Sequence, residues 1–198
     1  VASGSVFLGG MAEPVKTAKD PMSKLDQGIP FTKRPVALQF DYKTKREKQV
    51  YRATGSPKIS KLEGTDNAEA MMLLIHRWED EDGNVFAKRV GTAIEKFGSD
   101  VLEWVNDYQI PVHYGDITKE PFYKSYMGLI DTSSPNPYYT TNSKGKMVPV
   151  QEIGWAEPGV EPTHMILKIS SSDLGPYVGT VGSVFWLDNV ELVYDKKP

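Results

Sequence analysis

Apolar and polar residues alternate in several short segments of the chain, and glycine, proline, asparagine or aspartate residues separate these segments. In Pro35–Lys43 the alternation would place Val36, Leu38, Phe40 and Tyr42 on one face. A period of two is typical of a β-strand with one buried face. Similar alternation, or a short apolar block, predicts further strands at Val1–Leu8, Ala70–Trp78, Asn84–Val90, Trp104–Tyr114, Thr163–Ser171 and Val184–Tyr194.

Two short signals predict how these strands turn or bend. Asp82-Gly83 favours a type I′ hairpin, so Asn84–Val90 should return antiparallel to Ala70–Trp78. Asp188-Asn189 interrupts the alternation of the last segment. Such a polar doublet predicts a β-bulge or a buried polar anchor for a neighbouring loop.

Helical periodicity is weak throughout the sequence. Short helical turns are expected at Met22–Gln27, Ala93–Phe97 and Phe122–Met127, but none of these segments carries a sustained 3.6-residue period. The sequence therefore predicts an all-β fold: a two-sheet antiparallel β-sandwich of the jelly-roll type, with long loops and a few short helical turns. At 198 residues it is expected to form a single domain over residues 1–198.

The composition supports a folded domain with many turns. Apolar residues make up 39% of the chain and charged residues 25%, enough for a core and against disorder. The 17 glycines and 14 prolines are more than average, and six of them lie in the expected loops Thr44–Asp66 and Asp131–Lys146. Loops of this length are often functional.

Charge and residue usage exclude several classes of function. The 23 basic and 26 acidic residues give a net charge of −3, which argues against a nucleic-acid-binding surface. The absence of cysteine excludes disulfides, thiolate metal sites and cysteine nucleophiles. The longest apolar run, Ala70–Ile75, is far shorter than the roughly 18 residues of a transmembrane helix. Because the chain opens directly on a strand-like segment, we expect that a targeting segment or another domain precedes it.

Motifs of known enzyme classes are not found in the sequence. It has no G-x-S-x-G, H-E-x-x-H, P-loop or G-x-G-x-x-G motif, and its three histidines lie on separate predicted strands. Glycoside hydrolysis needs only two carboxylates. Asp41, with Glu103 or Asp107 near Trp104, is the pair to inspect for that chemistry. The acidic run near residue 80 resembles a calcium loop, but valine stands where that loop needs glycine.

Aromatic residues offer a second route to function. Sugars present apolar C–H faces ringed by hydroxyl groups, so binding sites for them combine flat aromatic rings with a few polar side chains. The candidate carbohydrate-binding residues are Trp78, Trp155, Tyr138, Tyr139, Asp41 and His76. Trp104 and Trp186 fall within well-patterned strands, and we expect them in the core.

Three blocks of the chain together resemble one family. The first, G-I-P-F-T-K-R-P at Gly28–Pro35, runs into L-Q-F-D-Y-K at Leu38–Lys43. The second, Ile169–Asp173, is a strand ending in a serine cluster. The third, Gly182–Leu192, is similar to a closing strand found in many carbohydrate-binding jelly rolls. In these blocks the chain resembles the putative carbohydrate metabolism domain family, found mainly in Bacteroidetes, over nearly its whole length.

The resemblance implies a place in glycan handling. Members look like lipoproteins of the cell surface or periplasm, often with an immunoglobulin-like domain before the jelly roll, and some have been called putative glycoside hydrolases. An extracytoplasmic location is therefore expected. In related sugar-binding jelly rolls the aspartate equivalent to Asp188 often holds a structural Ca²⁺, but partner carboxylates are not evident here, so neither a metal nor another cofactor is predicted.

Three functions remain open at this point. The favoured one is a non-catalytic module that binds an oligo- or polysaccharide. The first alternative is a glycoside hydrolase that uses an Asp/Glu pair, for which a cleft with two nearby carboxyl groups would be required. The second alternative is a structural or adhesin-like module that binds protein, which should expose an apolar patch.

Overall fold

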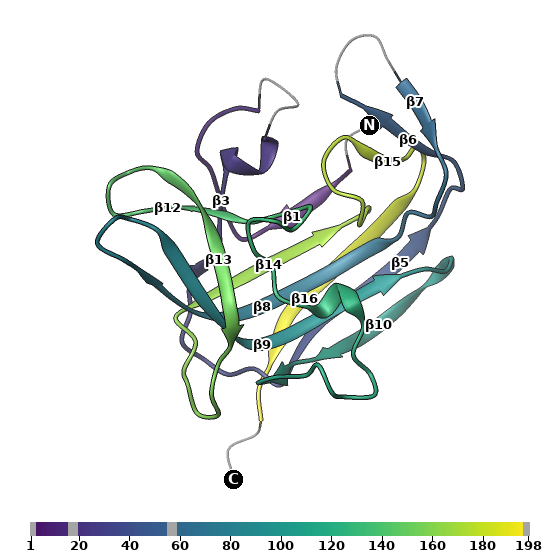
Figure 1. Ribbon diagram of the computed structural model, residues 1–198. Coiled ribbons are helices and arrows are strands. Elements are labelled where there is room, and N and C mark those ends of the chain that lie inside the picture. Colours follow the sequence, from purple (N-terminus) through teal and green to yellow (C-terminus); the bar gives the residue numbers. More distant parts are fainter. Residues whose placement is uncertain (1–2, 16–19, 55–58, 196–198) are drawn as a thin grey trace.

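Strands make up almost all of the regular structure in the computed structural model of the protein (Figure 1). The structure describes residues 3–15, 20–54 and 59–195. Within these residues, helix is limited to two 3-10 turns, η1 (Pro21–Lys24) and η2 (Ser125–Met127). The described residues contain no helix with the length and apolarity required to span a membrane. The all-β prediction is confirmed.

The largest sheet contains ten strands and is nearly barrel-shaped. Its main path is β1 (Ser5–Phe7), β14 (His164–Ser170), β8 (Ala68–Glu79), β9 (Val85–Phe97), β13 (Met147–Trp155), β12 (Tyr139–Thr141), β3 (Leu25–Gln27) and β2 (Gly9–Met11). Two short strands lie off this path, β4 (Ile29–Pro30) on β14 and β11 (His113–Tyr114) on β9. Pairing is antiparallel except between β13 and β9 and between β12 and β3.

One short segment joins the two ends of this sheet. β1 and β2 follow each other in the chain, yet they are the two end strands of the sheet, β1 pairing with β14 and β2 with β3. Between them, the Leu8 N–H donates to the carbonyl oxygen of Leu167 at 3.0 Å, and the Leu8 oxygen accepts from the Gly28 N–H at 2.9 Å. Gly9, with φ of 145°, turns the chain at this corner.

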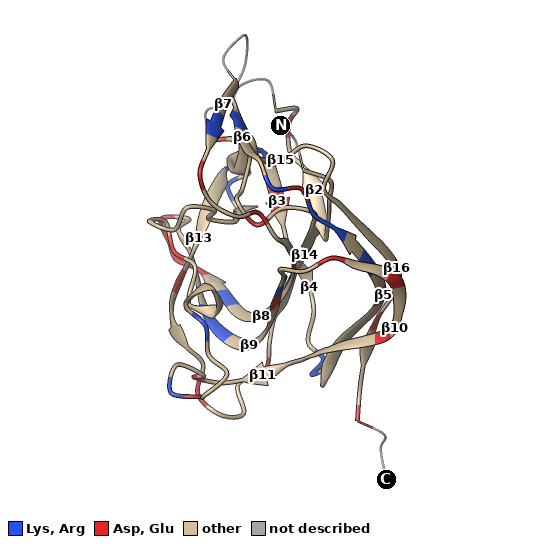
Figure 2. Cartoon of the chain, turned by 90° about the vertical axis from the view of Figure 1, so that its right-hand side faces the viewer, with Lys and Arg blue, Asp and Glu red and all other residues tan. Residues whose placement is uncertain are grey.

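Two further sheets complete the fold, where the sequence predicted two sheets in total. The central strand of one is β5 (Ala37–Lys45), flanked by β10 (Val101–Pro111) and β16 (Val184–Val193). The other consists of β15 (Val178–Thr180), β6 (Val50–Ala53) and β7 (Ile59–Leu62). In Figure 2 the β10-β5-β16 sheet forms one layer, and β8, β9 and β13 lie in the layer opposite it.

The first core fills the space between these two layers. Leu38, Phe40 and Tyr42 of β5 are buried there, as their alternation predicted, against Met72 and Leu74 of β8. Aromatic rings from three further strands contact Phe40 and Tyr42. This packing leaves the opposite face of β5 turned away from the core.

The second core lies inside the curled sheet. Met71, Leu73 and Ile75 alternate with the first-core residues along β8, which explains why this strand is apolar at consecutive positions. Arg89 and Glu152 are fully buried in this layer, with the Arg89 Nη2 donating to Glu152 Oε2 at 2.5 Å. This ion pair could not be predicted from the sequence, because its partners lie 63 residues apart.

The turns and loops of the chain agree only in part with the sequence predictions. The Asp82-Gly83 hairpin is confirmed, since β8 and β9 pair antiparallel on either side of it. The expected helical turn at 93–97 is wrong, because these residues continue β9 between two neighbouring strands. The stretch 44–66, expected to be a loop, contains β6 and β7, although residues 55–58 lie outside the described part of the chain. The stretch 131–146 contains β12.

Candidate functional site

The outer face of the β10-β5-β16 sheet carries two exposed tryptophans. Trp104 of β10 is 45% exposed and Trp186 of β16 is 38% exposed. The Lys43 Nζ of the central strand lies 5.1 Å from the ring centroid of Trp104 and 5.0 Å from that of Trp186. The three side chains therefore form one row across the sheet, and we call the surface around this row the tryptophan face.

The expectation that Trp104 and Trp186 lie in the core is wrong. In β16 both faces are apolar around Trp186, and Phe185 and Leu187 take the inward positions. In β10 the pairing with β5 shifts twice, between Val101 and Val105 and between Val105 and Tyr108. These irregularities turn Tyr108 inward and leave Trp104 outside, although a regular strand would place both side chains on one face.

Asp41 lies in the next row of the tryptophan face and holds a bulge on each side. Its Oδ1 accepts from the backbone N–H of Asp107 at 2.7 Å, and its Oδ2 accepts from the Asn189 Nδ2 at 2.6 Å. Asp107 and Asn189 both have left-handed backbones, with φ of 55° and 51°. The β16 register shifts between Asp188 and Glu191, so the bulge predicted from Asp188-Asn189 is confirmed.

A third row contains amide side chains linked to acids. The Gln39 Nε2 donates to Asp107 Oδ1 at 3.1 Å and to Glu191 Oε1 at 2.5 Å, and the Gln109 Nε2 donates to Gln39 Oε1 at 2.5 Å. Acidic residues are visible on β10 and β16 in Figure 2. These hydrogen bonds fix the orientation of the polar groups beside the indole rings.

The arrangement is suited to holding a ligand with an apolar face and polar edges. The two indoles offer flat apolar surface, and the Lys43 ammonium between them can donate hydrogen bonds. Of the three acids proposed from the sequence, Glu103 is an exposed residue of β10, and Asp41 and Asp107 lie on this face. Both carboxylates are engaged within the sheet, Asp41 through both oxygens to the bulges and Asp107 to Gln39.

The structure brings Trp78 and His76 together, but on another sheet. The Trp78 ring lies 6.1 Å from Phe86 and 6.3 Å from His76, measured between centroids, and Trp78 is 38% exposed. The His76 Nδ1 lies 3.0 Å from the carbonyl oxygen of Glu161. Asp41 faces outward from β5, so it does not share a surface with this aromatic group.

The remaining candidate residues lie on or next to strands β12 and β13 of the large sheet. Tyr138 is buried, and its hydroxyl donates to Glu152 Oε1 at 3.0 Å. Burial, followed by the charge of Glu152, raises the pKa of Tyr138 well above its usual value. Tyr138 lies in the loop before β12, as predicted, but its side chain is buried in the second core and is not open to solvent. Trp155 is half-buried, with its ring 5.7 Å from the Arg89 guanidinium, and Tyr139 is a half-buried residue of β12.

Among the residues that the structure describes, no three histidine, aspartate or glutamate side chains are grouped so that they could hold a metal ion.

Comparison with known proteins identifies the fold. No family model matches the chain, and no curated protein matches it. Among the solved structures that are similar to it are two from Bacteroides species. A putative glycoside hydrolase from Bacteroides thetaiotaomicron VPI-5482 has a TM-score of 0.57 and 20% identity, covering 98% of this chain and 48% of that one. A putative glycoside hydrolase from Bacteroides vulgatus ATCC 8482 has a TM-score of 0.50 and 17% identity, covering 96% of this chain and 64% of that one.

At these identities the likeness concerns the fold alone. The chain spans about half the length of the first structure and about two thirds of the second. Both proteins are named as putative glycoside hydrolases, and the family that the sequence resembles is also named for carbohydrate metabolism.

Proposed function

We propose that this chain is a non-catalytic carbohydrate-binding module of the jelly-roll type, and that an oligo- or polysaccharide binds across its tryptophan face. The observation that carries the proposal is the row Trp104, Lys43 and Trp186. Indole rings stack on the C–H faces of sugars, and neighbouring polar groups bind the hydroxyls at the ring edges. An open sheet face can accept successive units of a chain.

The roles of the acids favour binding over hydrolysis. A general acid or nucleophile must be free to meet the glycosidic bond. Both Asp41 oxygens instead accept hydrogen bonds that hold the bulges, and Asp107 Oδ1 accepts from Gln39. A glycoside hydrolase remains the alternative, favoured by the names of the two similar structures. The proposal includes an extracytoplasmic location, where polysaccharides would be met.

The proposal is tested with a panel of soluble plant and host polysaccharides, using affinity electrophoresis for binding and the release of reducing ends for hydrolysis. We expect retardation by at least one polysaccharide without release of reducing ends. Release of reducing ends that is lost in Asp41→Asn would support the hydrolase instead. Absence of binding across the panel at millimolar sugar concentrations would overturn the proposal.

A further inference from the structure

A second concave site lies on the opposite side of the large sheet from the tryptophan face. It is a cavity of about 250 Å³ between β1, β14, β3, η1 and the loop that follows β14. Its polar lining includes Ser5, Ser170, Gln27, Asn136 and Lys168, and its apolar wall includes Phe7, Met22 and Leu25. Ser170 belongs to the serine cluster of the second block that resembles the carbohydrate-related family.

Gln27 gives this cavity an unused hydrogen-bond donor. The residue is only 3% exposed, and its Nε2 has no hydrogen-bond partner among the described residues. Buried donors are nearly always paired in folded proteins, because an unpaired one costs free energy. A ligand oxygen in the cavity would supply the missing acceptor.

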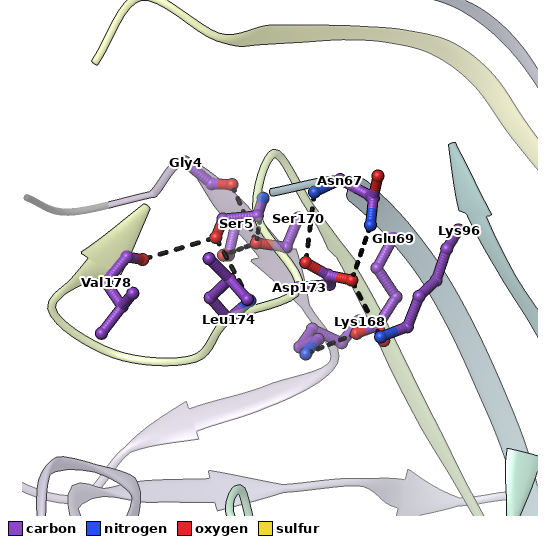
Figure 3. A network of polar contacts seen from close by, with 11 residues as sticks. Gly4, Ser5, Asn67, Glu69, Lys96, Lys168, Ser170, Asp173, Leu174 and Val178 are labelled. Atoms are coloured by element: carbon purple, nitrogen blue, oxygen red, sulfur yellow. Dashed lines mark hydrogen bonds and ion pairs between the residues drawn. The ribbon is translucent and has the colours of Figure 1, made fainter. Parts of the chain in front are cut away.

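Ser5 provides an acceptor in the same cavity. Its hydroxyl donates to the Ser170 Oγ at 2.8 Å, so its proton is already used (Figure 3). The Ser170 Oγ also accepts from the Ser172 N–H at 3.3 Å. The lone pairs of the Ser5 oxygen are thereby left to accept from a ligand N–H or O–H.

The charges beside the cavity are compensated. The Lys168 Nζ lies 2.8 Å from Glu69 Oε2, and the Lys96 Nζ lies 2.8 Å from Asp173 Oδ2, both shown in Figure 3. Burial raises the pKa of Asp173, but hydrogen bonds from Lys96 and Asn67 outweigh this effect and lower it. Since each cation has an anionic partner, the site is suited to a neutral ligand.

The unpaired Gln27 donor and the Ser5 acceptor, set beside an apolar wall, are the complement of a secondary amide. We infer that the cavity binds the acetamido group of an N-acetylated sugar, with its carbonyl oxygen toward Gln27, its N–H toward Ser5 and its methyl group on the apolar wall. A ligand hydroxyl that accepted from Gln27 would leave its own proton unpaired against the apolar wall. A carbonyl oxygen has no proton and can only accept, so it fits this position better. The inference rests on the proposed function, because a peptide also contains secondary amides.

The test uses methyl N-acetyl-β-D-glucosaminide as the probe, with methyl β-D-glucoside and N-acetylglycine methylamide as comparison ligands. Calorimetry should detect millimolar binding of the acetamido sugar and weaker or undetectable binding of the other two. Gln27→Leu should weaken this binding by roughly tenfold or more, since the carbonyl oxygen loses its donor. The melting temperature of Gln27→Leu should not fall, because the lost donor has no partner in the free protein.

A second measurement uses the unaltered protein and needs no variant. In ¹H–¹⁵N spectra of the unaltered protein, the acetamido sugar should shift the side-chain amide signals of Gln27, and the glucoside should not. Unshifted signals, equal binding of the glucoside, preference for the peptide amide, or a marked loss of stability in Gln27→Leu would each overturn the inference.

Trp186→Ala separates this inference from the proposed function. The variant should bind the acetamido sugar like the unaltered protein while losing polysaccharide binding. If Trp186→Ala loses polysaccharide binding but neither protein binds the acetamido sugar, the result would support the tryptophan face and contradict only the cavity. Binding of the acetamido sugar with no tryptophan-dependent polysaccharide binding would contradict only the tryptophan face.

Discussion

At the scale of single residues, hydrogen bonds determine the shape of the tryptophan face. Asp41 is central because each of its oxygens accepts from a different flanking strand. Sequence alternation placed Asp41 on the polar face of β5 correctly. It could not show that Asp107 and Asn189 would be its partners, since they lie 66 and 148 residues away.

Asp41→Asn tests this role. The Asp41 carboxylate accepts from two donors, the Asp107 N–H and the Asn189 Nδ2. An asparagine side chain has only one acceptor oxygen, so its amino group would face one of these donors and leave it unpaired. We expect a loss of about 1–3 kcal/mol in the free energy of unfolding, measured by urea denaturation. Glu103→Gln, an exposed change in the same sheet, should stay within about 0.5 kcal/mol of the unaltered protein. Equal stability of the two variants would contradict a structural role for Asp41.

The buried pair Arg89–Glu152 is a second residue-scale feature. Glu152 accepts from Arg89, from the Tyr138 hydroxyl and from the Ile130 N–H. Glu152→Gln leaves the Arg89 charge buried without an anion, so we expect it to cost about 3–5 kcal/mol in denaturant unfolding. The exposed pair Lys45–Glu47 is the control, and Glu47→Gln should cost less than about 1 kcal/mol. A small effect of Glu152→Gln would mean that solvent reaches the pair.

At the scale of elements, the sequence predicted strands well where alternation is regular and failed where the backbone departs from it. The β8–β9 hairpin followed from Asp82-Gly83, and the inward face of β5 followed from its period of two. In β10 the register shifts twice, so Trp104 faces outward while Tyr108 faces the core. A bulge depends on partners in neighbouring strands, so the period of a single segment cannot reveal it.

The corner between β1 and β2 gives a testable case at this scale. Gly9 has φ of 145°, and a Cβ placed there would meet the Asp26 carbonyl oxygen at 2.0 Å. Gly9→Ala should therefore weaken the closure of the sheet and lower the free energy of unfolding by about 1–3 kcal/mol or more. Gly10→Ala is the matched control, because a Cβ there meets nothing within 4 Å. Similar thermal unfolding of both variants would show that the corner relaxes without cost.

At the scale of the whole molecule, each candidate site is assembled from distant parts of the chain. The tryptophan face combines the fifth, tenth and sixteenth strands, and the cavity combines residues near positions 5, 27 and 170. The sequence indicated aromatic residues and a carbohydrate-related family. It could not indicate which aromatics share a surface, because that depends on sheet order. Trp104 and Trp186 were therefore assigned to the core, while Trp78 and Trp155 were preferred.

The most direct test of the central claim compares three single tryptophan variants on a polysaccharide that the unaltered protein binds. Trp186 and Trp78 are both 38% exposed, so Trp78→Ala is a matched control for Trp186→Ala. We predict that Trp104→Ala and Trp186→Ala each weaken binding by roughly tenfold or more in calorimetric titrations, and that Trp78→Ala leaves it unchanged. Loss of binding in Trp78→Ala, with full binding in the other two variants, would contradict the tryptophan face as the glycan-binding surface.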